Sequence, residues 1–388
     1  MKRLHVINLG KMGGAEKIFL QFLHNTTSGS DSILCISNHI APEIADGLGN
    51  TPVVFANRLT NSAPLKLPVF LRKLALLKKI EKQQADLVIF WDFVPNLKRK
   101  IRNSKTIYYD HGCSWRFPLN NKTLGFFAKV DGCIAVSYAS KRVMEERFNL
   151  TCPIEIVSNC VPPPVIPITP KTVEPTTHVV LGTASRLVSL KGIGVSILTL
   201  QELLKNNISA ELYIAGKGPD EEALRKLVAK LKLEKHVHFL GFQQDLTSFF
   251  NRIDFYISTP VTESFGLSCL EALYHAVPVI FPLIDGQPEV IPDGKCGIGI
   301  EPRLTFEQYY ALTGINIDFP HDVFNAVKQQ LMPPLVLAPD ECAQQIINII
   351  RQRQYLTFSK NALQHANTQF DYTLFVKNLE QSLSCFIN

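Results

Sequence analysis

The segment Pro260-Val-Thr-Glu-Ser-Phe-Gly-Leu-Ser-Cys-Leu-Glu271 is the most informative stretch of this 388-residue chain. It follows an apolar run, Phe255–Ser258, that is typical of a buried strand, and it leads into a helical pattern over Gly266–His275. The N–H groups at the start of that helix, around Phe265–Leu267, can bind phosphate. Glu263 stands beside them, and a carboxylate at this place can accept hydrogen bonds from vicinal sugar hydroxyls.

Three other charged side chains are candidates for the same site. Glu271 lies about one turn inside the predicted helix, where it either accepts hydrogen bonds from a ribose or only complements the helix N-terminus, an effect of about 0.3–1 kcal/mol. Arg186 and Lys191 follow a second predicted strand and precede a helical pattern over Gly194–Asn206. Two cations at such a turn suit a diphosphate, because Arg offers a planar fork and Lys a point charge. The other interpretation is a pair of solvated surface charges.

Short apolar runs alternate with amphipathic segments along most of the chain, which predicts parallel strands joined by helices. The predicted strands of the first half are Leu4–Leu9, Ser32–Ile36, Pro52–Phe55, Asp86–Trp91, Thr106–Asp110 and Gly132–Val136, and those of the second half are Val179–Thr183, Glu211–Ala215, Val237–Leu240, Phe255–Ser258 and Val279–Phe281. Further predicted helices are Glu16–His24, Pro68–Gln84, Pro219–Leu231 and Leu246–Asn251. We therefore expect an α/β protein of two doubly wound, Rossmann-like domains facing a central cleft, with ligands outside the carboxyl ends of the strands.

Proline marks the boundary between the two predicted domains. Six prolines fall within residues 161–177, which is typical of an interdomain linker. The expected domains are residues 1–160 and residues 178–365, the second with an irregular insertion at about residues 303–337. An amphipathic tail, residues 366–388, is expected to form a closing helix.

The composition excludes several classes of protein. With 46% apolar and 19% charged residues, the chain is neither disordered nor fibrous. No apolar run reaches the ~20 residues that span a bilayer, and the first ten residues fit a buried strand better than a signal peptide. The nine cysteines include no Cys-x-x-Cys pair, which argues against a disulfide framework or a zinc knuckle and fits a cytoplasmic protein.

The net charge of +6 is unevenly distributed. Residues 1–160 hold 22 basic and 12 acidic side chains, a balance of +10, whereas the remainder has a balance of −4. Many of the basic side chains gather in a helical pattern and a following cluster, here called the basic set: Arg72, Lys73, Lys78, Lys79, Lys98, Arg99 and Lys100. The basic set predicts contact with an anionic membrane surface or a phosphorylated glycolipid, at about 1 kcal/mol per basic residue. The other interpretation is a solvated surface, and without a recognised nucleic-acid-binding module nucleic acid is not an expected partner.

A glycine pair follows the first predicted strand. Gly13 and Gly14 stand directly before the helix that begins near Glu16. Glycine lets the backbone come close to a ligand, and the helix N-terminus offers N–H groups to an anion. A plain tight turn is the other interpretation of this pair.

Several short motifs occur in order along the chain. They are Gly13–Glu16 (Gly-Gly-Ala-Glu), Asp110–Gly112 (Asp-His-Gly), Ala135–Ser137 (Ala-Val-Ser), Ser185–Gly192 (Ser-Arg-Leu…Lys-Gly), Ile214–Pro219 (Ile-Ala-Gly-Lys-Gly-Pro), Phe239–Gly241 (Phe-Leu-Gly), the Glu263…Glu271 pair and Asp285–Ile291 with its Pro-Glu-Val-Ile. Each motif alone is weak, but together they resemble the GT-B glycosyltransferases, specifically glycosyltransferase family 4, over roughly residues 1–300.

The resemblance implies a role for each candidate residue. Gly13 and Gly14 would line the donor diphosphate from the N-terminal side, and His111 would approach the donor sugar. Arg186 and Lys191 would hold the diphosphate from the other side, while Glu263 would contact sugar hydroxyls and Glu271 the ribose. The main chain at Phe265, Gly266 and Leu267 would contact the donor, and the nucleoside pocket would be bordered by Gly216, Gly218, Gly241 and Phe242.

The implied activity is the retaining transfer of a sugar from a nucleotide-diphosphate donor, with a UDP-sugar favoured, to a glycan or glycolipid acceptor. The implied setting is bacterial lipopolysaccharide or polysaccharide synthesis at the inner face of the cytoplasmic membrane. No Asp-x-Asp motif occurs, so no metal is expected, and no cofactor is implied besides the donor substrate. The alternatives are a GT-B sugar-nucleotide epimerase, which needs no acceptor, and a non-catalytic partner that binds nucleotide sugars.

This sequence departs from the family pattern in three places. Asp285-Gly286 stands where the family has a Gly-Gly pair, which bears on the donor-sugar pocket. The linker has Val157-Ser-Asn-Cys-Val-Pro162 where the family commonly has Pro-Asn-Gly-Val-Asp. The insertion at 303–337 has no counterpart among the family's donor motifs.

Overall fold

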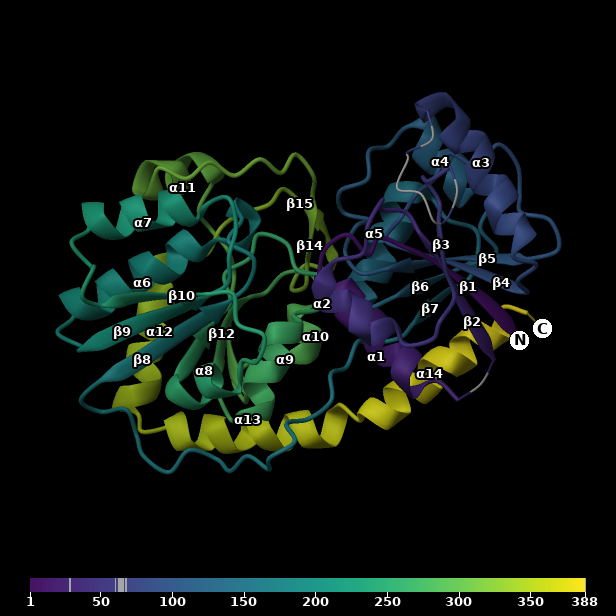
Figure 1. Cartoon of the computed structure of the whole chain (residues 1–388). Coiled ribbons are helices and arrows are strands. Elements are labelled where there is room, and N and C mark those ends of the chain that lie inside the picture. The colour runs from purple at the N-terminus through teal and green to yellow at the C-terminus, as the bar shows by residue number, and fades with distance from the viewer. Residues whose placement is uncertain (28, 60, 62–65, 67, 388) are drawn as a thin grey trace. The chain divides into compact units, whose positions relative to one another are not determined.

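The computed structural model describes residues 1–27, 29–59, 61, 66 and 68–387 (Figure 1). For Val69, Phe70, Leu71, Lys73 and Leu74 it describes the backbone alone. The chain forms two compact units: the first unit is Met1–Cys160 together with Tyr372–Asn388, and the second unit is Val161–Asp371.

The first unit is built on a seven-stranded parallel sheet with the strand order β3-β2-β1-β4-β5-β6-β7. Its strands are β1 (Lys2–Ile7), β2 (Ser30–Cys35), β3 (Val53–Phe55), β4 (Leu87–Trp91), β5 (Lys105–Asp110), β6 (Gly132–Ala135) and β7 (Ile154–Ile156). Its helical segments are α1 (Gly14–Asn25), α2 (Pro42–Ala45), η1 (Asp46–Leu48), α3 (Val69–Lys82), α4 (Asn121–Phe127), α5 (Tyr138–Phe148) and α14 (Tyr372–Cys385). Central strands such as β4 are buried along their whole length, as expected of a parallel sheet covered on both faces.

The second unit has a six-stranded parallel sheet with the order β10-β9-β8-β11-β12-β13 and a separate antiparallel hairpin, β14-β15. Its strands are β8 (Val179–Ala184), β9 (Ala210–Ala215), β10 (Val237–Gly241), β11 (Phe255–Ile257), β12 (Val279–Pro282), β13 (Gly297–Ile300), β14 (Val323–Asn325) and β15 (Gln330–Met332). Its helical segments are η2 (Ser189–Lys191), α6 (Ile193–Lys205), α7 (Glu221–Lys230), α8 (Thr247–Arg252), α9 (Leu267–Tyr274), α10 (Gln287–Val290), α11 (Phe306–Thr313), α12 (Pro339–Arg351) and α13 (Tyr355–Gln369). The two sheets confirm the predicted fold class.

A buried polar network fastens the C-terminal helix α14 to the first unit. The fully buried guanidinium of Arg3 donates two hydrogen bonds to the Asp31 carboxylate, at 2.6 and 2.7 Å. Another of its nitrogens lies 4.0 Å from the carboxylate of Glu380 on α14, which also accepts a hydrogen bond from the Thr27 amide. Gly132 completes the contact, since a Cβ there would lie 2.1 Å from the Phe386 ring.

The bounds of the two units differ from the expected domains. Residues 161–177 belong to the second unit, where the Lys171 amide donates to Ser359 and the Lys171 ammonium to the Asn251 carbonyl. The expected helix of the tail is α14, which starts at Tyr372 and belongs to the first unit, whereas residues 366–369 are the end of α13. The insertion contains α11 and the β14-β15 hairpin.

The fold predicts which half of the chain depends on α14. The side chain of Leu379 is fully buried, whereas Leu374 on the same helix is 50% exposed. Leu379→Ala is expected to destabilise the first unit by about 2–5 kcal/mol, and Leu374→Ala by much less. The chain has two tryptophans, Trp91 and Trp115, and both are buried in the first unit, so their fluorescence in a denaturant titration reports the unfolding of that unit. Equal effects of the two substitutions would contradict the placement of α14.

Candidate active site

The strand order of the second unit changes direction at β8. This strand pairs with β9 on one side and with β11 on the other. The loops that follow β8 and β11 therefore diverge at the carboxyl edge of the sheet, which is where open α/β sheets bind ligands. Arg186 and Lys191 lie on the loop after β8, and Glu263 lies on the loop after β11.

An ion pair joins these two loops. The Lys191 ammonium lies 2.6 Å from a carboxylate oxygen of Glu263, and their side chains are 24% and 20% exposed. Arg186, five residues before Lys191 in the chain, is exposed. The structure thus brings together Lys191 and Glu263 from segments 72 residues apart in the sequence.

The first turn of α9 begins at Leu267, four residues after Glu263. Gly266 precedes the helix with a φ of 100°, a conformation that favours glycine, and Leu267 is the first helical residue. Phe265 is buried, with its ring in edge contact with Phe370 at a centroid distance of 6.2 Å. Glu271 lies one turn inside α9 and is partly exposed. These residues have the positions along the helix that the sequence predicts.

The predicted nucleoside-pocket glycines pack against the loop that carries Arg186. A Cβ on Gly216 would lie 1.8 Å from the Ser185 carbonyl oxygen, and one on Gly218 would lie 2.1 Å from the Leu187 carbonyl oxygen. The Gly241 carbonyl accepts a hydrogen bond from the Gly216 amide. A side chain at Gly216 or Gly218 would therefore displace the Arg186 loop. Backbone packing alone is a sufficient reason for glycine at these two positions. The next residue, Phe242, is a large apolar side chain with 56% of its surface exposed.

Asp285 fixes the backbone beside Glu263. One carboxylate oxygen accepts hydrogen bonds from the Thr262 hydroxyl and the Glu263 amide, at 2.8 and 2.9 Å. The other accepts from the amide of Phe324 in β14, at 2.8 Å. The side chain is 1% exposed and its φ is +49°. Two departures from the family pattern, Asp285 and the insertion at 303–337, are therefore linked. Asp285 joins the β14-β15 hairpin of the insertion to the loop that carries Glu263.

The remaining candidates, Gly13, Gly14 and His111, belong to the first unit. Gly13 precedes α1 after β1, and His111 follows β5, so both lie at the carboxyl edge of the sheet. Both ring nitrogens of His111 are buried, and burial lowers the pKa of His111 to about 3, so its ring is neutral at physiological pH. Their joint action with Lys191 and Glu263 stays a prediction.

Asp92 is a site residue that the sequence reasoning missed. It follows β4 with a φ of +48°, and its carboxylate accepts a hydrogen bond from the His111 amide at 2.7 Å. Burial, together with the nearby Asp110 carboxylate, raises the pKa of Asp92 to about 8. A carboxyl directly after a buried strand, at the same sheet edge as His111, was the available signal.

Part of the basic set is engaged within the first unit. The Lys79 ammonium donates to the carbonyls of Phe55, Ala56 and Arg58. Arg99 pairs with Glu81 through two hydrogen bonds, and Lys100 lies 3.3 Å from Asp131. Lys78 and Lys98 are exposed, and the side chain of Lys73 lies outside the described part of the structure. Lys79 and Arg99 thus have partners within the first unit, and membrane contact through the basic set stays a prediction.

The described residues contain neither a membrane-spanning helix nor a metal-ligand cluster. Within residues 1–27, 29–59, 61, 66 and 68–387, no helix is long and apolar enough to cross a bilayer. The same residues contain no group of three or more His, Cys, Asp or Glu side chains placed to hold a metal ion.

Comparisons with known proteins agree with this geometry. A model described as Glycosyltransferase Family 4 matches residues 12–163, and one described as Glycosyl transferases group 1 matches residues 167–310. The solved structure of Anabaena HepE in complex with UDP and glucose aligns with a TM-score of 0.69 at 18% identity, over 99% of this chain and 100% of HepE. The chain belongs to the family 4 glycosyltransferases of GT-B fold.

Curated relatives match over shorter stretches. The alpha-monoglucosyldiacylglycerol synthase of Acholeplasma laidlawii is 30% identical over 116 residues, and the match spans only 29% of this chain and 29% of that protein. An uncharacterized glycosyltransferase of Haemophilus influenzae is 25% identical over 291 residues, or 71% of this chain and 78% of the relative. In this family 4 glycosyltransferase the group 1 match ends at residue 310, before the β14-β15 hairpin that Asp285 contacts.

The Asp285 contacts generate a stability prediction. Asp285→Asn keeps the shape of the side chain and tolerates the left-handed backbone, but it turns an NH2 group toward one of the donors. We expect a loss of about 1–3 kcal/mol in the unfolding free energy of the second unit, measured by circular dichroism during urea titration. The control is Asp340→Asn, since Asp340 forms an exposed ion pair with Arg303 in the same unit. A loss no larger than that of the control would contradict the role of the buried carboxylate.

Asp92 generates a pH prediction for the first unit. An acid whose pKa is raised on folding binds its proton more tightly in the folded state, so stability falls as the pH rises from about 4 to about 8. Asp92→Asn removes this proton equilibrium, so the unfolding free energy of the variant should fall less as the pH rises. Tryptophan-monitored unfolding at pH 5.5 and pH 9 measures the difference, and the exposed Asp46→Asn should follow the wild-type chain. The same pH dependence in Asp92→Asn and wild type would overturn the prediction.

Proposed function

We propose that this glycosyltransferase moves a sugar from a nucleotide-diphosphate donor, a UDP-sugar, to a glycan or glycolipid acceptor. The observation that carries the proposal is the Lys191–Glu263 ion pair, at 2.6 Å, on the loops that follow β8 and β11, close in sequence to the first turn of α9. The pair places one cation and one carboxylate at the same point. A diphosphate would use the cation, and sugar hydroxyls would use the carboxylate.

In the proposed reaction the bond between the anomeric carbon and the diphosphate oxygen breaks, a bond to the acceptor oxygen forms, and the proton of the acceptor hydroxyl passes to the departing nucleotide diphosphate. Arg186 and Lys191 offset the charge that develops on the leaving nucleotide, together with the N–H groups of the first turn of α9. Glu263 orients the sugar through its hydroxyls, and the buried Asp285 keeps Glu263 in place. Retention of configuration and independence of metal are part of the proposal and rest on the family resemblance.

The acceptor side of the proposal rests on the first unit. The name of the Acholeplasma relative describes synthesis of a glucosyl diacylglycerol, which supports a lipid-linked acceptor here. We place the reaction in bacterial lipopolysaccharide or polysaccharide synthesis at the cytoplasmic face of the membrane, with Lys78, Lys98 and Lys100 as membrane contacts. Co-sedimentation with anionic and neutral liposomes at low and high salt tests this contact, because screening weakens exposed charges. Binding that does not change with lipid charge or salt concentration would contradict the proposed membrane contact.

The proposed reaction is separated from its rivals by an experiment without acceptor. The chain is incubated with UDP-, GDP- and ADP-sugars, with and without EDTA, and the products are resolved. Slow hydrolysis that leaves the sugar unchanged supports transfer, and its persistence in EDTA supports metal independence. An isomerised sugar would instead identify an epimerase, and binding without turnover a non-catalytic partner.

Glu263 provides the direct test by substitution. Glu263→Gln removes the charge that Lys191 faces, and the partly exposed Lys191 can be hydrated, so the fold should survive. We expect kcat/KM for the donor to fall by about 100-fold or more. Glu222→Gln is the matched control, because Glu222 is 79% exposed on α7 and forms an ion pair with the exposed Lys226. Near-normal turnover in Glu263→Gln would show that the donor site lies elsewhere.

A further inference from the structure

Two cysteines of the first unit lie in contact with each other. Cys133 is the second residue of β6, and Cys152 lies two residues before β7. Their sulfur atoms are 3.8 Å apart, within hydrogen-bonding distance for two thiols, and both cysteines are free. The pairing of β6 with β7 brings them together, because the Cys133 amide donates to the Pro153 carbonyl at 2.9 Å. The contact therefore follows from the register of the sheet.

The two thiols differ in their surroundings. Cys133 is fully buried in the hydrophobic core of the unit, whereas Cys152 packs against that core and is partly exposed. The hydrogen bond from the Cys133 thiol lowers the pKa of Cys152, and the same bond raises the pKa of Cys133 well above its usual range. The Lys100 ammonium also lowers the pKa of Cys152, while burial and Asp131 oppose the shift. One sulfur is thus suited to react with a reagent from solvent, and the second sulfur lies next to it.

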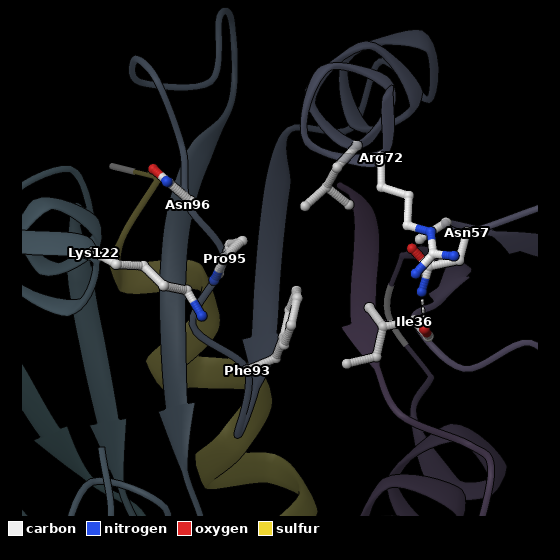
Figure 2. Close-up of a pocket in the computed structure, with 9 residues that line it drawn as sticks. Ile36, Asn57, Arg72, Phe93, Pro95, Asn96 and Lys122 are labelled. Atoms are coloured by element: carbon white, nitrogen blue, oxygen red, sulfur yellow. Dashed lines mark hydrogen bonds between the residues drawn. The ribbon is translucent and has the colours of Figure 1, made fainter. Parts of the chain in front are cut away.

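The thiol pair lies apart from a cavity in the same unit. This cavity, of about 310 Å³, is lined by side chains that include Ile36, Phe93 and Lys122 (Figure 2). Among the described residues that line it, none is a cysteine. Ile36 and Phe93 follow the carboxyl ends of β2 and β4, whereas Cys133 and Cys152 lie at the amino ends of β6 and β7. Modification of the thiols is therefore expected with no ligand in that cavity.

We propose that Cys133 and Cys152 are a modification site, at which a small-molecule disulfide such as oxidised glutathione converts the two thiols into a reversible disulfide. A sulfur–sulfur bond is about 2.0 Å long, so each sulfur has to move by roughly 1 Å from its place in the structure. Rotation of the Cys152 side chain accounts for such a movement without loss of a backbone hydrogen bond. The proposal goes beyond the proposed transfer reaction and does not depend on it.

The modification takes place in two thiol–disulfide exchange steps. In the first, the Cys152 thiolate attacks one sulfur of oxidised glutathione, which forms a mixed disulfide and releases one glutathione thiolate. In the second, the Cys133 thiol loses its proton and its sulfur attacks the Cys152 sulfur, which releases the second glutathione. The protein loses two protons and two electrons in total. Oxidised glutathione takes them up and becomes two thiols.

The disulfide would close a loop around helix α5, which lies wholly between the two cysteines in the chain. Such a link removes conformations from the unfolded chain and so stabilises the folded unit. Helix α5 is also bonded to the segment after β5, since Ser140 donates to the Asp110 carboxylate and Arg147 to the Phe117 carbonyl. His111 lies between those two attachment points. Oxidation should therefore make both α5 and the His111 segment more rigid.

The chemical test uses the full-length chain in buffers with an increasing ratio of oxidised to reduced glutathione. Free thiols are alkylated, and tryptic peptides are identified by mass spectrometry without reduction. Trypsin cuts after Lys141, Arg142 and Arg147, so a Cys133–Cys152 bond joins two separate peptides. We expect this linked product, and we expect dithiothreitol to remove it. A pair that stays unlinked at every ratio, or a bond from Cys152 to another cysteine, would overturn the proposal.

Single substitutions test the order of the two steps. Cys133→Ala should stop at the mixed disulfide of Cys152 with glutathione, because the second thiol is missing. Cys152→Ser should leave Cys133 unmodified, because Cys133 is fully buried. Cys385→Ser is the control, since Cys385 is an exposed cysteine at the end of α14 and its loss should leave the Cys133–Cys152 bond intact. Modification of Cys133 in the Cys152→Ser chain would overturn the assigned order.

Unfolding and hydrogen exchange measure the consequence for the fold. Tryptophan fluorescence should give a higher urea midpoint for the oxidised chain than for the reduced chain, and dithiothreitol should restore the lower midpoint. Cys152→Ser should have the same midpoint with and without oxidised glutathione. Amide hydrogen exchange should be slower in α5 and in residues 110–117 of the oxidised chain. Equal midpoints in the two redox states would overturn the stabilising role, and unchanged exchange in residues 110–117 would overturn the coupling to the His111 segment.

Discussion

In both sheets the first strand of the unit lies in the interior, paired with the second strand of that unit on one side and with the fourth on the other. The loops that follow β1 and β4, or β8 and β11, must therefore diverge at the carboxyl edge of their sheet. The left-handed Asp92 and the glycine pair lie on such loops in the first unit. Lys191 and Glu263 lie on such loops in the second. Strand order thus decides where the polar side chains of each unit gather, before any individual contact is made.

The strand order alone would leave those loops free to move, and buried polar groups remove that freedom. The Glu263 backbone is bonded to a carboxylate that is itself bonded to the hairpin strand β14. A buried carboxylate is tolerated because it accepts at least three hydrogen bonds. The same arrangement recurs in the first unit, where the Asp92 side chain accepts a hydrogen bond from the His111 backbone. Asp285 in the second unit sets the position of Glu263, and Asp92 in the first unit sets the position of His111. Glu263 and His111 are proposed to contact substrate, whereas Asp285 and Asp92 need not do so.

The sequence predicted the fold through periodicity, and it located Lys191, Glu263 and the start of α9 because all three follow strongly apolar strands. The edge strand β13 was missed, since Gly-Ile-Gly-Ile alternates glycine with isoleucine and lacks a continuous apolar run. Asp92 and the role of Asp285 were missed for another reason. Their function depends on hydrogen bonds to backbone groups 19 and 39 residues away, and such pairings leave no local pattern. The assignment of Gly216 and Gly218 to the nucleoside pocket stays a prediction, and close backbone packing is a second reason for glycine at both positions.

The basic side chains behind the positive balance of residues 1–160 differ in their surroundings in the structure. Arg3 pairs with Asp31, Lys79 donates to three carbonyls and Arg99 pairs with Glu81, so these cations have partners within the first unit. A count of charges therefore overstates the surface that is open to a membrane.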